Sequence, residues 1–482
     1  MEGTRMTDTG HTVRAYLAAH RRDMADALAA LVRIPSVKAA PLPGAPFGRA
    51  CADALLYTQA LYEKEGFATQ LDADGGYLLA GFGDGAASLG LFAHADVIAA
   101  GNGWTVTDPF VPAEKDGCLF GRGALDDKAA VILSLWCAKT LRDLALPFRS
   151  RLVCFTGTNE ESGMRDIQHY LTRHTPPDFA LVPDSAFPPY RGNKGILLFE
   201  AAVRLPAGPV ETLSADNCLG QIPGSASARL RYDEKLFAAL ETLCDGAFTV
   251  RRAGGSIRAA AFGHAGHTAL PEGTVNAGGI LADRLSRCPM LDEETRAALA
   301  FAAAVMTHHY GEPLGIADSD PDFGRLTIAC DAIRLRNGRL TLHFNIRCGA
   351  RVYDGLPAAL EKAFSGRGWR IRILSRTKPH LLDADDPLLD ACLRVWQACS
   401  GRRDVPRINA GGTYAMHLPK AIEIGPVYAR RQPPLPAGHG AVHQPDEYAD
   451  IDGLLQATEI AVRMLLACDE RLHPQAGEGA AP

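Results

Sequence analysis

The chain has 482 residues, 47% of them hydrophobic, so it can bury one large core or two ordinary ones. The net charge is -5, the isoelectric point is about 6.3, and acids and bases are interspersed. This composition favours neither nucleic acid nor an anionic membrane surface as a partner. The twelve cysteines are scattered without a CxxC pair, which predicts reduced thiols. Because no signal peptide or membrane-spanning run is apparent, we expect a cytoplasmic protein.

The first 190 residues alternate between predicted helices and strands. Apolar positions at helical spacing predict helices over 12–34, 50–66 and 126–144. Short apolar runs that stop at a polar residue predict strands over 89–94, 151–157 and 179–184. The alternation indicates an α/β fold with a mostly parallel central sheet flanked by helices. In such sheets, ligands gather beyond the carboxyl ends of the strands.

The character of the sequence changes at about residue 195. Segments such as GILLFEAAVRL and RLTLHFNIR resemble half-exposed strands, and alanine-rich helices separate them. A Pro- and Asp-rich link over 376–390 then leads into another helix. We therefore predict one α/β domain made of residues 1–194 and 379–482, and an inserted α+β domain over 195–378.

Acidic residues and histidines lie at or just after the ends of predicted strands and at the start of one predicted helix. They are His94, Asp96, Asp126, Asp127, Glu160, Glu161, Asp184 and, near the C-terminus, His443. A buried cluster this acidic would be unstable unless cations neutralised it, because each unpaired charge costs several kcal/mol. Imidazole and carboxylate are the ligands of catalytic zinc sites. Two metal ions about 3.5–4 Å apart can share a carboxylate and activate water for amide hydrolysis.

Each of these residues has a simpler interpretation when it is taken alone. His94 could be a satisfied histidine at a strand end, Asp126–Asp127 a helix N-terminus, and Glu160–Glu161 a solvated loop. Only the joint pattern favours a metal site. The chain contains 15 histidines, so His443 depends on the sequence around it.

The motifs around these residues resemble the M20 family of di-zinc metallopeptidases, most closely its peptidase V-type dipeptidases. The resemblance covers about residues 12–470 and is highly specific. The matching blocks are HADVIAAGNGWTVTDPFVPAEKDGCLFGRGALDDKA (94–129), GTNEESG (157–163), VPDSAFPPYRGNKG (182–195), GHTALPEGTVNA (266–277), NAGGTYA (409–415) and AVHQPDEY (441–448).

The resemblance implies two zinc ions per chain, for which cobalt or manganese could substitute. His94, Asp126 and Asp184 would hold one ion. Asp126, Glu161 and His443 would hold the other, with Asp126 as the bridge.

Three neighbouring residues receive roles by the same resemblance. Asp96 would hydrogen-bond the outer nitrogen of His94 and fix its tautomer. The Asp126–Asp127 peptide bond would be cis. Glu160 would be the general base that acts with a metal-bridging hydroxide.

The inserted domain matches the lid of this family. His267 would face the oxyanion of the tetrahedral intermediate, and Arg347 would grip the terminal carboxylate of the substrate. Taken alone, these residues would be a surface-loop histidine and a solvated strand arginine. Gly412 in NAGGTYA is also expected to contact substrate. Gly220 replaces a substrate-binding asparagine of the family, and Asn217 is the candidate substitute.

These matches imply a zinc-dependent enzyme that hydrolyses dipeptides with a free N-terminus. In the family, aspartate at the position of Asp184 accompanies aminopeptidases and dipeptidases, whereas glutamate accompanies carboxypeptidases and deacylases. A lid of roughly 185 residues resembles the double lid of peptidase V and implies a monomer. The alternatives are a deacylase of N-acyl amino acids, a carboxypeptidase, and a binding protein that has lost activity.

Overall fold

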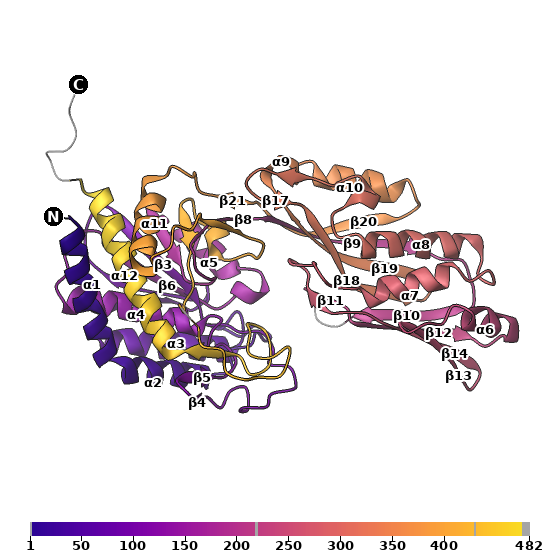
Figure 1. Ribbon diagram of the computed structural model, residues 1–482, viewed down its shortest axis with the longest axis horizontal. Helices are drawn as coiled ribbons and strands as arrows, with labels where there is room; N and C mark the ends of the chain where they lie inside the picture. Colours follow the sequence, from indigo (N-terminus) through magenta and orange to yellow (C-terminus); the bar gives the residue numbers. More distant parts are fainter. Residues whose placement is uncertain (1, 217–219, 429, 475–482) are drawn as a thin grey trace, which may run out of the picture. The chain divides into compact units, whose positions relative to one another are not determined.

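The computed structural model describes residues 2–216, 220–428 and 430–474. The chain forms two compact units, which are treated separately below (Figure 1). The first contains residues 1–192, 381–409 and 413–482, and the second contains residues 193–380 and 410–412. The borders lie two residues from the expected ones, and the short segment 410–412 was not expected in the second unit. Among the described residues, no helix is long and apolar enough to cross a membrane.

The first unit is built on a mixed nine-stranded sheet. Its order is β1-β2-β6-β3-β7-β23-β8-β21, and β22 pairs with β8. The pairs β6–β3, β3–β7 and β7–β23 are parallel, whereas β1–β2, β2–β6 and β23–β8 are antiparallel. The α/β prediction is confirmed, with a parallel centre and antiparallel flanks. The strands are β1 (Ala68–Asp72), β2 (Tyr77–Phe82), β3 (Ser88–His94), β6 (Arg151–Gly157), β7 (Phe179–Val182), β8 (Tyr190–Asn193), β21 (His380–Leu381), β22 (Arg407–Asn409) and β23 (Ala421–Glu423).

Helices cover both faces of this sheet because its central strands are apolar on both sides. Along β3, Leu89, Leu91 and Ala93 join the larger core, whereas Phe92 joins a smaller aromatic core that α5 covers. A separate small sheet has the order β24-β5-β4. The remaining elements of the unit are α1 (Glu2–Ala19), α2 (Arg21–Val32), α3 (Arg49–Lys64), β4 (Ala113–Lys115), β5 (Cys118–Phe120), α4 (Lys128–Asp143), η1 (Glu160–Ser162), α5 (Arg165–Arg173), α11 (Pro387–Ser400), η3 (Tyr414–His417), β24 (Tyr448–Asp450) and α12 (Ile451–Leu472).

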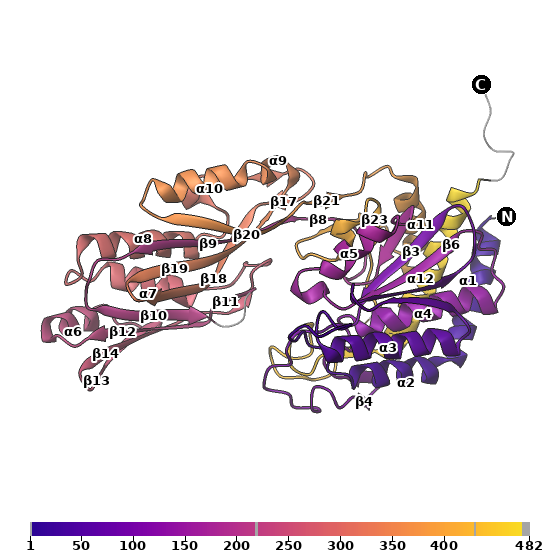
Figure 2. The same ribbon diagram turned by 180° about the vertical axis from the view of Figure 1, so that it is seen from behind.

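The second unit contains one antiparallel eight-stranded sheet, seen from opposite sides in Figures 1 and 2. Its order is β13-β14-β12-β10-β18-β19-β9-β20, and α7, α8 and α10 pack against one face of it. The elements are β9 (Gly195–Arg204), β10 (Val210–Asp216), β11 (Gln221–Ile222), β12 (Ser225–Arg231), α6 (Glu234–Glu241), β13 (Phe248–Ala253), β14 (Ser256–Phe262), β15 (Gly266–His267), α7 (Ala277–Ser286), α8 (Glu293–Thr307), η2 (Glu312–Leu314), β16 (Ser319–Asp320), β17 (Gly324–Arg325), β18 (Thr327–Arg336), β19 (Arg339–Cys348), α9 (Ala350–Tyr353), α10 (Leu356–Ser365) and β20 (Arg370–Thr377).

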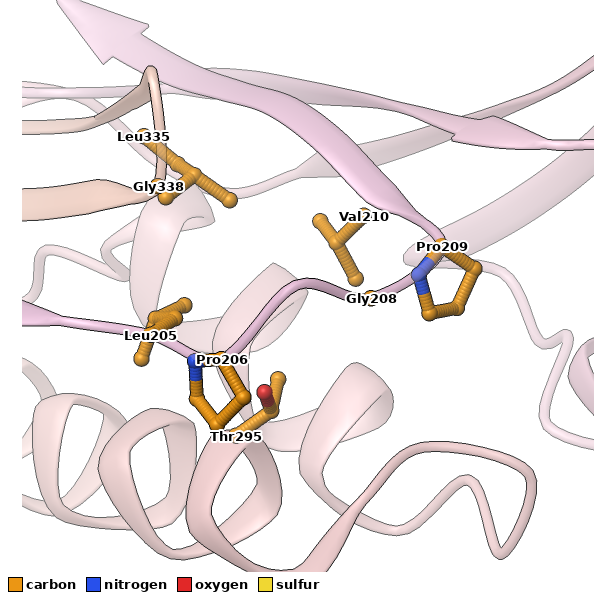
Figure 3. Close-up of a pocket in the computed structure, with 8 residues that line it drawn as sticks. All are labelled: Leu205, Pro206, Gly208, Pro209, Val210, Thr295, Leu335 and Gly338. Carbon is orange, nitrogen blue, oxygen red and sulfur yellow. The ribbon is translucent and has the colours of Figure 1, made fainter.

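A small pocket lies in the second unit at the link between β9 and β10 (Figure 3). Leu205, Pro206, Val210 and Leu335 line it together with Thr295 of α8. Its volume of about 20 Å³ has room for roughly one water molecule. It is therefore too small to be a substrate site.

We expect Asp469→Ala to lower the stability of the first unit by about 1–3 kcal/mol, because it leaves buried donors without a partner. Asp469 is 1% exposed on α12 and accepts hydrogen bonds from Arg149 N, Ser150 N and Ser150 Oγ at 3.1, 2.7 and 2.6 Å. Thermal unfolding followed by circular dichroism should show the loss. The exposed neighbour Glu470 is the control, and Glu470→Ala should leave the melting temperature unchanged.

Candidate metal centre

The carboxyl ends of three adjacent parallel strands meet at one edge of the first sheet. Strand β3 ends at His94, β6 leads into Glu160 and Glu161, and β7 is followed by Asp184. The topology therefore brings these side chains together at the carboxyl ends of the strands, as the sequence predicted.

Asp126 stands between two histidines. Its Oδ1 lies 3.2 Å from His94 Nε2, and its Oδ2 lies 3.1 Å from His443 Nε2. Asp184 Oδ2 is 3.7 Å from the same nitrogen of His94, and Glu161 Oε1 is 2.9 Å from the same nitrogen of His443. Each oxygen of Asp126 thus faces a different histidine–carboxylate pair.

Two groups of donor atoms are compact enough to hold a metal ion each. In the triads His94–Asp126–Asp184 and Asp126–Glu161–His443, all donor atoms lie within 4.8 Å of one another. Asp126 is common to both triads. Nitrogen and carboxylate oxygen are the ligands that zinc prefers. The geometry and chemistry of these residues therefore fit two cations with a shared carboxylate.

The tautomer of His94 supports this interpretation. Its Nδ1 lies 3.0 Å from the carbonyl oxygen of Asp96, an acceptor only, so Nδ1 must carry the hydrogen. Nε2 is buried, faces carboxylates and has no hydrogen bond of good geometry within the described chain. A lone pair among carboxylates is repelled, so either a proton or a metal ion must lie at Nε2.

Asp96 contacts both the histidine and the two glutamates. Its carboxylate lies 3.4 Å from His94 Nδ1, and it accepts the backbone N–H groups of Glu160 and Glu161 at 3.2 Å each. The expected contact with His94 is present, mainly through the carbonyl. The bonds to the two amides were not anticipated, and they tie the β6 loop to the end of β3.

The pKa shifts show that the ionised forms of three of these carboxylates are disfavoured. Burial and then the charge of Asp184 raise the pKa of Glu160. Burial and then Asp126 raise the pKa of Glu161 to about 7, and burial raises that of Asp184 to about 6. Although burial opposes it, hydrogen bonds to Asp126 and Glu161 raise the pKa of His443 to about 11. Bound cations would remove this resistance to ionisation.

The Asp126–Asp127 peptide bond is cis, as the resemblance implied. Asp127 precedes α4, yet its side chain makes no capping hydrogen bond to that helix. Instead it is buried and accepts the backbone N–H of His94 at 3.2 Å. The simpler interpretation of these aspartates as a helix cap is therefore not supported.

Three buried carboxylates outside the predicted site hold its loops. Glu447 accepts the backbone N–H groups of Leu125 and Asp126 at 3.0 Å each and pairs with buried Arg122. It directly follows the HQPD segment, but its partners lie more than 300 residues earlier, so the sequence alone gives no signal for this role.

Asp166 holds the loop that precedes the glutamates. It accepts the N–H groups of Thr158 and Asn159 at 2.7 Å and the hydroxyl of Tyr414 at 2.5 Å. Asp446 ties the loop of His443 to another loop, because its carboxylate accepts the N–H groups of Thr105 and Val106. Asp166 lies in the first turn of α5 and Asp446 in a loop, and neither position has a pattern in the sequence that marks this role.

The remaining predicted residues belong to the second unit. His267 Nδ1 accepts the N–H of Ala269 at 3.2 Å, so the neutral ring carries its hydrogen on Nε2. Arg347 is 7% exposed, its Nε and Nη1 make no hydrogen bond within the described chain, and burial lowers its pKa to about 10. Gly412 lies in the segment 410–412. Asn217 lies outside the described residues.

A family model described as "Peptidase family M20/M25/M40" matches residues 90–467. The chain therefore belongs to this family of metallopeptidases, which hydrolyse peptide bonds, and the predicted membership is confirmed.

Its relatives carry dipeptidase names. "Putative dipeptidase YtjP" of Bacillus subtilis is 27% identical over 438 residues, which cover 87% of this chain and 90% of the relative. "Putative dipeptidase SH1171" of Staphylococcus haemolyticus is 26% identical over 436 residues, covering 86% and 90%. Human carnosine dipeptidase 1 has a similar fold, with a TM-score of 0.59 at 16% identity over 96% of this chain and 99% of that one. Dug1p of Saccharomyces cerevisiae also has a TM-score of 0.59, at 12% identity over 96% and 98%.

We expect metal ions to stabilise the first unit, because a cation relieves the repulsion among Asp126, Glu161 and Asp184. Adding Zn²⁺ to chelator-treated protein should raise the melting temperature by about 2–8 °C. Asp126→Asn should abolish most of that rise, whereas the exposed control Asp74→Asn should keep it. Unchanged melting in Zn²⁺, Co²⁺ and Mn²⁺ would count against the metal centre.

Proposed function

We propose that the protein is a zinc-dependent dipeptidase that cleaves dipeptides with a free N-terminus. The observation that carries the proposal is the sharing of Asp126 by two donor triads, with the buried carboxyl of Glu160 beside them. The dipeptidase names of relatives that are 26–27% identical along most of the chain support the same reaction. We further propose that the enzyme is monomeric and cytoplasmic.

Two zinc ions are proposed for the centre, held by His94, Asp126 and Asp184 and by Asp126, Glu161 and His443. When bound, they would supply a Lewis acid for the scissile carbonyl and acidify a water molecule. Asp96 would keep the Nδ1 hydrogen of His94 in place through its carbonyl, so that Nε2 presents its lone pair. It would also hold the amides of Glu160 and Glu161, so the base and its neighbouring ligand keep a fixed separation.

Glu160 is proposed as the general base and later the general acid. Its Oε1 is buried and makes no hydrogen bond within the described chain, so this atom is open to accept a proton. Burial and then the charge of Asp184 raise the pKa of its carboxyl, which makes its carboxylate a stronger base. The proton would pass from the attacking water to Oε1 and then to the leaving amine.

Three residues of the second unit are proposed to act on the substrate. The Nε2–H of His267 would donate a hydrogen bond to the oxyanion. The guanidinium of Arg347 has unbonded N–H groups and would bind the terminal carboxylate. Gly412 would contact the substrate through its backbone. The role of Asn217 also stays a proposal.

Substitutions at the adjacent glutamates should separate the base from the ligand. Glu160→Gln is expected to keep two metal ions per chain and to lose about 10³-fold or more in kcat, because it cannot accept the proton. Glu161→Ala should lose about one metal ion per chain, because one donor triad is incomplete. Elemental analysis and dipeptide hydrolysis measure both effects. An active Glu160→Gln enzyme would show that another group is the base.

Substrate pairs should distinguish the dipeptidase from the alternatives. Free dipeptides should be cleaved at least about 10-fold faster than their N-acetyl counterparts. C-terminal amides should lose about 10²-fold in kcat/KM, because Arg347 would lack its carboxylate. Faster cleavage of acylated substrates would indicate a deacylase or a carboxypeptidase. The Arg347→Ala variant is the control, since it should no longer distinguish acid from amide.

A further inference from the structure

A buried carboxylate on β18 contacts the residue that precedes β11, the strand paired with the one that carries His267. Strand β18 contains an irregularity in its register with β19 between Cys330 and Ala332. Such bulges redirect the side chain of the extra residue, which here is Asp331. Asp331 is 1% exposed, and its Oδ2 accepts a hydrogen bond from Gly220 N at 2.9 Å.

Gly220 in turn contacts the short strand that carries His267. Its carbonyl oxygen accepts the N–H of Thr268 at 2.9 Å, and the next residue, Gln221, pairs with His267 in the β11–β15 ladder. Only two hydrogen bonds therefore separate the carboxylate of Asp331 from the residue after His267.

His343 completes the arrangement from β19. Its Nδ1 lies 2.5 Å from Asp331 Oδ1, and its side chain is 12% exposed. An ionised carboxylate only accepts hydrogen bonds, so Nδ1 of His343 donates. With both oxygens of Asp331 bonded, the carboxylate cannot rotate without losing a bond to His343 or to Gly220.

A second contact holds the other end of the His267 segment to the same bulge. Asn276 Nδ2 donates to the carbonyl oxygen of Cys330 at 2.7 Å, and its Oδ1 accepts N–H groups at the start of α7. Asn276 thus anchors the chain after His267, and Asp331 anchors the strand beside it. The points of attachment on β18 are the adjacent residues Cys330 and Asp331.

We propose that Asp331 and His343 are positioning residues that orient the imidazole of His267 during catalysis. This inference rests on the proposed role of His267 as the oxyanion donor. Neither residue needs to touch the substrate. Their effect is on the direction of the Nε2–H bond of His267, and that direction decides how well the ring stabilises a transition state.

A double-mutant cycle tests whether Asp331 acts through His267. Asp331→Ala is expected to lower kcat by about 10–100-fold, less than His267→Ala, and to change KM for a dipeptide less than about threefold. In a His267→Ala background, Asp331→Ala should change kcat less than about twofold. Equal losses in both backgrounds, or an unchanged kcat in Asp331→Ala, would falsify the inference.

Two variants of His343 give a milder test that does not depend on removing the buried carboxylate. His343→Asn keeps an N–H near the place of Nδ1 and should retain at least about half of kcat. His343→Leu removes the donor and should behave like Asp331→Ala. Asp354 and His308 are exposed in the same unit, so Asp354→Ala and His308→Leu are matched controls that should leave kcat unchanged. Equal activity of His343→Asn and His343→Leu would overturn the role of His343.

The ring signals of His267 separate a failure of this inference from a failure of the proposed function. In protein labelled with ¹⁵N-histidine, the Nδ1 and Nε2 shifts of His267 should change in Asp331→Ala and His343→Leu but not in the two controls. If His267→Ala leaves kcat unchanged, the oxyanion role is wrong. The ¹⁵N shifts alone then show whether Asp331 and His343 orient the imidazole of His267. Unchanged shifts in Asp331→Ala would show that no positional link exists.

Discussion

The arrangement of the first unit depends on the repulsion among carboxylates at the edge of its sheet. Asp126, Glu160, Glu161 and Asp184 approach one another around two imidazoles, and burial makes the charges of Glu160, Glu161 and Asp184 harder to keep. Hydrophobic packing cannot offset such a concentration of like charge. The hydrogen bonds from the amides of Glu160 and Glu161 to Asp96, and from the amide of Asp126 to Glu447, hold the carboxylates in place.

The division of work between neighbouring residues follows from backbone geometry. Glu160 and Glu161 occupy a single 3₁₀ turn after β6, and only the second approaches a histidine within hydrogen-bond distance. The first points its Oε1 at no partner in the described chain. Adjacent side chains leave the backbone in different directions, so one short segment can serve a ligand role and a proton-transfer role together.

The site residues at or just after strand ends could be predicted, because a polar residue after an apolar run can be recognised in the sequence itself. His94, Glu161 and Asp184 belong to this group, and the parallel topology brings them together. The family motif was needed for His443, because no strand precedes it closely. Long-range support such as Asp166 and Glu447 could not be predicted, since only the folded chain places these carboxylates against backbone amides of distant segments. The hairpin β1–β2 and the antiparallel flanks were likewise not anticipated.

The discontinuity of the first unit has a consequence for biosynthesis. His94, Asp126 and Asp184 all precede the second unit in the chain, whereas His443 follows it. A ribosome therefore synthesises every donor of one triad before the second unit, and the last donor of the other triad only after it. The two triads therefore become complete at different times, and the nascent chain carries Glu161 without its histidine partner until His443 has been made.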